Sequence, residues 1–208
     1  MFRQVSAALI LAPCLFFGLL VGAREAGAEI LPAALPALAP GDLLFKGADT
    51  GAGTQLAVAW SLGDKRWGHV GIVVGNPDGS LAVIHADTGA RREIGHVRRV
   101  SLAEYLSDVS GLGVYGIDLE GKARADYLAY AESAVGRPFD KAFSIESENS
   151  LYCSELVWRA MSAGLGEDAI PEKSERLGRI YVSVSDLADH PRVHERAVIK
   201  AAAATASH

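Results

Sequence analysis

HVGIVVGNPDGSLAVIHA, residues 69–86, consists of two β-branched runs on either side of a cluster of turn-forming residues. The runs 70–74 and 81–86 predict two strands, and the segment 75–80 predicts the turn of a β-hairpin. Facing positions in such a hairpin have residue numbers that sum to roughly 154–156, so His69 and His85 are expected to lie opposite each other. The stretch therefore predicts two neighbouring imidazoles at one end of a hairpin.

A second informative stretch is LYCSELVWRAMSAG, residues 151–164. Its apolar residues recur at helical spacing, which predicts a helix over 151–163 that Gly164 ends. Cys153 then lies in the first turn, where free N–H groups and the helix dipole favour a thiolate over a thiol. The sequence alone leaves a second interpretation open, because free cysteines are also common as buried apolar contacts.

A thiolate and an imidazole together suggest nucleophilic catalysis. His69 is the first candidate for the base, since the start of a strand holds it rigidly at an edge. His85 is the candidate for the third residue, which fixes the tautomer of the base. Asp87 and His96 are alternatives for that third role. A surface histidine and a polar cross-strand pair are the structural interpretations that remain open for His69 and His85.

Other chemistries lack the motifs they need. Histidine and cysteine also bind zinc, but the chain has no CxxC, no HxxxH and no evident fourth ligand, so we predict no metal site. The phosphate-binding patterns GxGxxG and GxxxxGK[ST] and the serine-hydrolase pattern GxSxG are also missing. We therefore predict no cofactor.

The remaining pattern favours an α+β domain. Strands come early and late, with helices gathered between and after them, rather than in alternating βαβ units. The expected strands cover 43–46, 93–100, 112–119, 179–184 and 192–200, and the expected helices cover 54–62, 101–107 and 120–135.

The N-terminus has the features of a secretory signal over residues 1–28. Arg3 precedes an apolar run over 5–21, and Ala26-Gly27-Ala28 has the small-x-small form of a cleavage site. Retained, the same run would serve as a membrane anchor; a lipoprotein site at Cys14 is disfavoured because Pro13 precedes it. Cleavage would make the protein secreted or periplasmic, in the cell envelope, and would leave Cys153 as its sole cysteine.

The mature chain divides into three parts. Residues 29–40 contain a proline at every fourth position and are expected to form an extended lead-in. Residues 41–200 form the predicted domain, and the alanine-rich residues 201–208 a disordered tail. With 208 residues, 50% of them hydrophobic, the chain has enough apolar side chains for one core, which excludes a disordered protein. A net charge of -5 gives no basic surface for nucleic acid, so we expect no nucleic-acid partner.

Several motifs resemble a known group of enzymes. GDLLF at 41–45, GHVGIVVG at 68–75 and VIHA at 83–86 are similar to the barrel of NlpC-type cysteine peptidases. In that group the cysteine helix precedes these strands, whereas here it follows them. This order resembles the circularly permuted papain-like amidases of the YiiX/YaeF type, and RPFDKAFSIESENSLYCSELVW at 137–158 is similar to their cysteine segment.

The resemblance implies a circularly permuted papain-like fold, with a small antiparallel sheet or half-barrel packed against the cysteine helix. It implies that Cys153 is the nucleophile, His69 the base and His85 the orienting residue, although YiiX-type members often have Glu at the last position. Tyr152 replaces the aspartate of the NlpC motif, and the backbone N–H of Cys153 is the expected oxyanion donor. Asp42 and Glu155 are expected to be structural.

We therefore expect an exported cysteine amidase or peptidase that acts through an acyl-enzyme. A peptide or peptidoglycan stem peptide is the substrate that the resemblance suggests. Two alternatives remain: a lipid acyltransferase or thioesterase with the same site, and a non-catalytic module that binds the cell envelope. Membrane association is expected only if the N-terminal segment is retained, and the sequence makes no prediction of oligomeric state.

Overall fold

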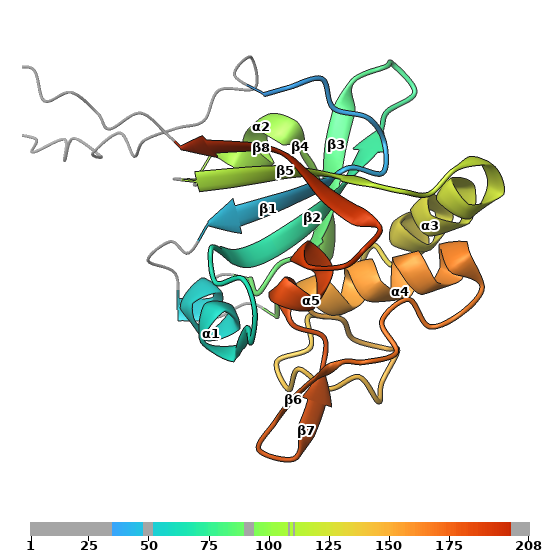
Figure 1. Ribbon diagram of the computed structural model, residues 1–208. Coiled ribbons are helices and arrows are strands. Elements are labelled where there is room, and N and C mark those ends of the chain that lie inside the picture. The colour runs from blue at the N-terminus through green and yellow to red at the C-terminus, as the bar shows by residue number, and fades with distance from the viewer. Residues whose placement is uncertain (1–34, 48–51, 90–93, 108, 110, 201–208) are drawn as a thin grey trace, which may run out of the picture.

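The computed structural model describes residues 35–47, 52–89, 94–107, 109 and 111–200. The expected signal segment 1–28, residues 29–34 of the lead-in and the tail 201–208 lie outside these residues. The described chain forms an α+β fold around a six-stranded antiparallel sheet in the order β4-β3-β2-β1-β5-β8 (Figure 1). Its strands are β1 (Leu43–Gly47), β2 (Trp67–Gly75), β3 (Leu81–Ala86), β4 (Val97–Ser101), β5 (Gly111–Ile117) and β8 (Val193–Lys200).

The register of the β2–β3 hairpin confirms the sequence prediction. Ile72 lies opposite Ile84 and Val73 opposite Val83, so that paired residue numbers sum to 156. The turn at 75–80 is closed by backbone and side-chain hydrogen bonds between Asn76 and Ser80. The β-branched runs thus pair as expected, and the register places His69 and His85 near the end of the hairpin that lies away from the turn.

Helices cover both faces of the sheet. On one face, the α4 helix (Cys153–Leu165) packs against β2, with α3 (Gly121–Ser133) beside it and the short α5 (Val184–Ala188) close by (Figure 1). The other face is covered by α2 (Leu102–Leu106), where Ser101 caps the helix and accepts the backbone N–H of Glu104, as its spacing predicts. The sheet therefore separates two hydrophobic cores, a large one under α4 and a small one under α2.

The expected strand over 179–184 is only partly confirmed. Residues Arg179–Tyr181 form β7, which pairs with β6 (Ser174–Arg176) in a separate two-stranded sheet. Ser183 then caps α5 and accepts the N–H of Asp186, whose carboxylate accepts the N–H of Ser183 in return. This capping box ends the strand early, because it commits the next residues to a helix.

The described part of the lead-in, residues 35–40, forms neither helix nor strand. Arg196 on β8 donates to the Ala37 carbonyl and Arg124 on α3 donates to the Pro40 carbonyl. Leu35 and Leu38 pack against the small core. The segment is thereby bound on the side of the small core, with polar contacts to β8 and α3.

The first helix, α1 (Ala52–Trp60), and the remaining helices are short. Among the helices described here, none has the length and apolarity needed to cross a membrane.

Candidate active site

Cys153 is the first residue of α4 and so lies in its first turn, as the helical spacing predicts. The expected end at Gly164 is wrong: the helix continues to Leu165 and ends at Gly166. Gly164 instead allows the close approach of α3, since a Cβ atom on this glycine would lie 2.6 Å from the Ala123 carbonyl oxygen.

The residues on either side of Cys153 bind a single peptide segment of the chain. The Tyr152 hydroxyl accepts the backbone N–H of Val182 at 2.9 Å, and the Ser154 hydroxyl donates to the Val182 carbonyl at 2.8 Å. Because both groups of Val182 are engaged, the position of the cysteine relative to the α5 region is fixed.

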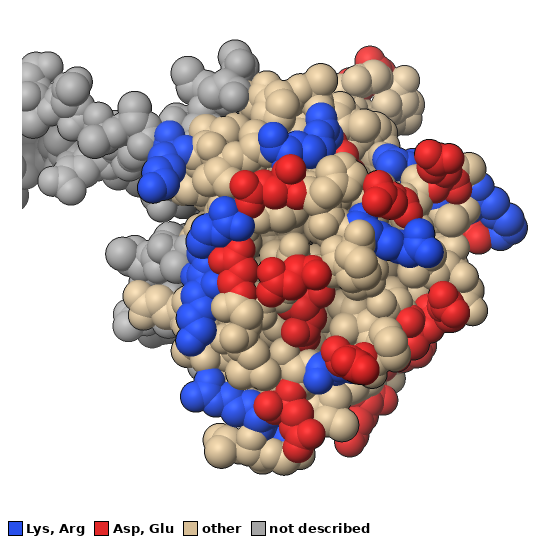
Figure 2. Space-filling view, viewed as in Figure 1, with Lys and Arg blue, Asp and Glu red and all other residues tan. Residues whose placement is uncertain are grey.

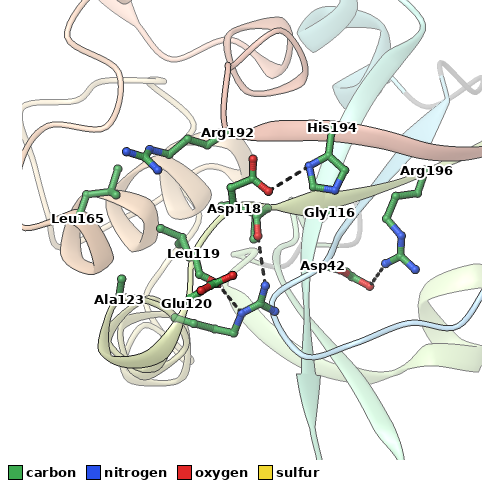
Figure 3. Close-up of a pocket in the computed structure, with 12 residues that line it drawn as sticks. Asp42, Gly116, Asp118, Leu119, Glu120, Ala123, Leu165, Arg192, His194 and Arg196 are labelled. Atoms are coloured by element: carbon green, nitrogen blue, oxygen red, sulfur yellow. Dashed lines mark hydrogen bonds and ion pairs between the residues drawn. The ribbon is translucent and has the colours of Figure 1, made fainter.

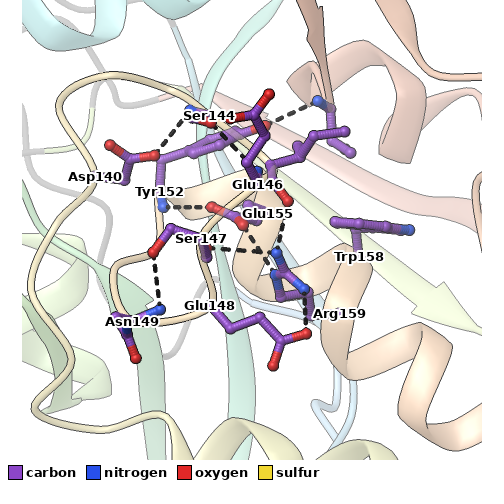
Figure 4. A network of polar contacts seen from close by, with 12 residues as sticks. Asp140, Ser144, Glu146, Ser147, Glu148, Asn149, Tyr152, Glu155, Trp158 and Arg159 are labelled. Carbon is purple, nitrogen blue, oxygen red and sulfur yellow. Dashed lines mark hydrogen bonds and ion pairs between the residues drawn. The ribbon is translucent and has the colours of Figure 1, made fainter.

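Glu155 stabilises the same helix start from within the core. Its carboxylate accepts the backbone N–H of Tyr152 at 3.4 Å and the guanidinium of Arg159 at 2.9 Å. Arg159 also binds Glu148 and the Ile145 carbonyl, and so connects the helix to the preceding loop (Figure 4). Burial raises the pKa of Glu155 to about 7, although Arg159 opposes the shift. The structural role expected for Glu155 is the one these contacts describe.

His69 and His85 lie in contact. The Nε2 atom of His69 is 2.9 Å from Nδ1 of His85, and the ring planes are 87° apart. The two alternatives to His85 have other partners. The Asp87 carboxylate accepts hydrogen bonds from the Gly89 N–H and the Arg98 guanidinium. The His96 side chain is exposed, and its backbone forms a β-bridge with Pro138. Among the described contacts, His85 is thus the residue that engages the His69 ring.

The two imidazoles share their face of the sheet with Tyr105 and Lys46. The Tyr105 ring centroid lies 6.1 Å from that of His69 and 5.2 Å from that of His85. Lys46, opposite His69 on β1, places its ammonium 4.3 Å from the Tyr105 ring centroid. Gly71 makes this packing possible, because a Cβ atom there would lie 2.6 Å from Val83 and 3.1 Å from Tyr105. The glycine of the HVGI motif therefore leaves space for the Tyr105 ring.

The thiol reaches this cluster from the α4 side. The Cys153 side chain is buried, and the backbone N–H of Val70 is directed at its sulfur. Cys153 thus contacts the peptide group that joins His69 to Val70, near the N-terminal end of β2. Burial raises the pKa of the Cys153 thiol, and N–H groups at the helix start only partly offset this effect. The expectation that the helix dipole favours a thiolate is wrong for the free protein, because desolvation is the larger effect.

The electrostatics of His69 match this description. Burial, the neighbouring His85 and the Lys46 ammonium all lower the pKa of His69 well below its ordinary value of 6.5. The site at rest therefore holds a neutral imidazole and a protonated thiol at neutral pH.

Sequence reasoning did not single out Lys46 or Tyr105. Lys46 ends the apolar run LLFK, and Tyr105 lies on a five-residue helix, so neither has a local feature that indicates a site. Their proximity to the histidines comes from strand register, which pairs Lys46 with His69. Only a prediction of the β1–β2 pairing could have found Lys46.

A cavity of about 260 Å³ opens beside Cys153. Trp60 and Tyr181 pack edge to face on one wall, with ring centroids 5.1 Å apart, and Phe143 and Tyr152 pack on another, 5.2 Å apart. The cavity is the concave, mostly apolar kind of space that small-molecule groups occupy in enzymes.

A larger cavity, of about 630 Å³, lies near α3 and β8 and includes none of the three candidate residues. Two of the three arginines that line it have structural partners. Arg196 pairs with Asp42 (Figure 3), and Arg124 donates to three backbone carbonyls. His194 faces Asp118 at 3.5 Å at its edge. Because its polar groups hold the lead-in and the strand ends, we assign the chemistry to the smaller cavity.

The described residues form neither a basic surface patch in the view of Figure 2 nor a cluster of metal-binding side chains. Acidic and basic side chains are interspersed over the face in Figure 2, rather than gathered into one basic patch. Within the described residues, no group of three or more histidine, cysteine or acidic side chains is placed to hold a metal ion.

Comparison with known proteins identifies a matching family and a similar solved structure. A family model described as permuted papain-like amidase enzyme, YaeF/YiiX, C92 family, matches residues 37–203. A crystal structure described as metalloprotein yiiX from Escherichia coli O157:H7 is similar with a TM-score of 0.60 and 18% identity, covering 76% of this chain and 96% of that one. The structural likeness shows the fold, a permuted papain-like one. A search of curated proteins gives no match.

Proposed function

Because this chain belongs to the permuted papain-like amidase family YaeF/YiiX, C92, and is therefore a cysteine hydrolase, we propose that it cleaves an amide through an acyl-enzyme on Cys153. The observation that carries the proposal is the contact of the Cys153 thiol with the His69–Val70 peptide, next to the His69–His85 pair. His69 acts as the base and His85 as the residue that orients it.

The ring contact assigns the nitrogen atoms. Because Nε2 of His69 faces Nδ1 of His85, Nδ1 of His69 is the atom left to take the thiol proton. A base at Nδ1 requires the proton of His69 on Nε2, where it donates to His85. His85 then holds its own proton on Nε2, within the electrostatic influence of Asp87. The pair thus fixes the tautomer that catalysis needs.

The reaction proceeds in two halves. Nδ1 of His69 takes the thiol proton as sulfur bonds to the carbonyl carbon, and the backbone N–H of Cys153 donates to the oxyanion. The C–N bond breaks, and the amine leaves with the proton from His69. Water then gives a proton to His69 and attacks the thioester, which releases the acid and restores the thiol. Since thiol and imidazole are neutral at rest, proton transfer accompanies attack.

Substitution of the nucleophile tests the mechanism. Cys153→Ala and Cys153→Ser are expected to lower kcat/KM for amide hydrolysis on the order of a thousandfold or more. Electrospray mass of the wild-type protein with substrate is expected to show an acyl adduct on Cys153. Hydrolysis retained in Cys153→Ala would contradict the covalent mechanism.

The substrate and location extend the proposal to the cell envelope. We propose a peptide or peptidoglycan stem peptide as substrate and a periplasmic or secreted protein, on the strength of the N-terminal segment 1–28. Expression with the native N-terminus in a Gram-negative host is expected to give an exported protein that begins at Glu29. A retained Met1, measured by intact mass, would contradict the processing.

The aromatic cavity beside Cys153 favours one alternative substrate, a lipid acyl ester. Parallel assays with muropeptides and with phospholipid vesicles distinguish a peptide substrate from a lipid substrate. Release of fatty acid without cleavage of muropeptides would assign the site to lipid.

A further inference from the structure

The cavity beside Cys153 has charged groups of one sign. Of the described residues that line it, Lys141 and Arg179 are the charged ones, and none is an aspartate or a glutamate. This cationic rim stands out in a chain whose net charge is -5. Among the residues that the structure describes, no carboxylate forms an ion pair with either of these two cations.

The chain fixes the rim in place. The Arg179 guanidinium donates to the Ala142 carbonyl, which holds it beside the loop that carries Lys141. Asp140 organises that loop, because its two carboxylate oxygens accept the N–H groups of Ala142 and Ser144, each at 2.8 Å. The cations and the cavity are thus joined through a hydrogen-bonded loop.

Phe143, in the wall of the cavity, has a strained backbone conformation. Its φ is 52°, in the left-handed region that bulky residues avoid, with a cost of about 1–2 kcal/mol. This backbone conformation directs the ring onto Tyr152, beside Cys153. Since the Asp140 carboxylate accepts the N–H groups of the residues before and after Phe143, the structure maintains the strained wall.

From this arrangement we propose that Lys141 and Arg179 select an anionic substrate: an amide whose aromatic or aliphatic group fills the cavity and whose carboxylate lies at the cationic rim. The inference rests on the proposed function for the nature of the bond that is cleaved. It concerns recognition, however, and binding can be measured without turnover. Lys141 and Arg179 are in this sense specificity-determining residues.

Three matched ligands test the proposal in the Cys153→Ala protein. They are N-succinyl-phenylalanine amide, its neutral isostere N-succinamoyl-phenylalanine amide, and the cationic N-(4-aminobutanoyl)-phenylalanine amide. Calorimetry is expected to give about tenfold tighter binding of the succinyl ligand than of the neutral one, with the cation weakest. Ala57→Phe, which fills the cavity, is expected to abolish binding of all three.

Charge variants assign the preference to the rim. Arg179→Gln and Lys141→Gln are each expected to reduce the ratio of succinyl-ligand affinity to neutral-ligand affinity to threefold or less. Arg179→Lys should keep most of the preference for the succinyl ligand, because it keeps the positive charge. Lys200→Gln, at the end of β8, controls for the loss of one positive charge elsewhere.

Equal binding of the three ligands, tighter binding of the cation, or no binding of any would overturn the proposal. A preference that survives both glutamine variants would overturn it as well. Binding selectivity in a protein that hydrolyses no amide would leave the anionic specificity standing and refute the proposed function. The two failures are therefore distinguishable.

Discussion

At the scale of single residues, Lys46 is the lysine whose charge, after burial and the neighbouring His85, lowers the pKa of His69. Its side chain is only 9% exposed and lies on the strand position opposite His69. The other groups around the imidazole pair are Tyr105 from α2, Cys153 from α4, and Arg98, which lies opposite His85 on β4. The positive charge of Arg98 is balanced by ion pairs with Asp87 and Glu104. A cation in this position disfavours a second positive charge on His69.

Lys46→Met tests this effect. Protonation of His69 removes the base, so kcat/KM is expected to fall as pH drops through its pKa, which lies below 6.5 in the wild type. The variant is expected to raise the pKa of His69 and to move the acid limb of the pH profile to higher pH. An NMR titration of the His69 ring measures the shift directly.

Lys46→Arg serves as the matched control and should keep the wild-type profile, because it keeps the charge. A Lys46→Met protein that folds but shows an unchanged His69 titration would refute the role of the ammonium. Loss of activity alone would not suffice, since a purely structural role predicts that outcome too.

At the scale of elements, the start of α4 depends on the clamp that Tyr152 and Ser154 form on Val182. Val182 is 1% exposed, so its N–H depends on the Tyr152 hydroxyl for its hydrogen-bond acceptor. A buried donor without an acceptor costs about 1–3 kcal/mol. The clamp therefore contributes to stability and sets the position of the nucleophile.

Tyr152→Phe is expected to lower the free energy of unfolding by roughly that amount, about 1–3 kcal/mol in chemical denaturation. Tyr130→Phe makes the same chemical change where the hydroxyl accepts a 3.3 Å bond from Arg137 at a half-buried position, and should cost less. Equal decreases in the free energy of unfolding of the two variants would show that the hydrogen bond to Val182 contributes no more stability than the one between Tyr130 and Arg137.

The hairpin and the cysteine helix were predictable because local chemistry determines both. Six turn-forming residues between two β-branched runs leave one register for β2 and β3, and apolar spacing places Cys153 in a first helical turn. The short β6 and α5 were not predictable, since elements of three and five residues are too short to show a periodic pattern. The Ser183–Asp186 capping box was present in the sequence, but the flanking valines favour a strand.

The candidate site was predictable in part for the same reason. His69 and His85 are close in sequence, and their contact follows from the hairpin. Lys46, Tyr105 and the cationic rim come together through pairings distant in sequence, such as that of Arg179 with Ala142. The lower readiness of the thiol to ionise also escaped prediction, because burial is a property of the folded chain.

At the scale of the whole molecule, the order of the segments along the chain is secondary to their packing. The cysteine helix follows the strands here, yet it packs on β2 and brings the thiol to the first residues of that strand. A site is defined by geometry, so permutation leaves its chemistry intact. The cost of this packing is a carboxylate, Glu155, enclosed in the core at the centre of the fold.

Glu155 makes the stability of the protein depend on pH. Its pKa is about 7 in the folded chain, above the ordinary value of 4.5, so the unfolded state releases this proton first as pH rises. The contribution of Glu155 is fully present below pH 4.5 and is lost as pH rises through 7, which amounts to roughly 2–3 kcal/mol. Glu155→Gln is expected to remove this decline in the free energy of unfolding between pH 4.5 and 8. Glu148→Gln, which changes the exposed partner of Arg159, should retain it. An unchanged pH dependence in Glu155→Gln would mean that Arg159 keeps the buried carboxylate ionised throughout.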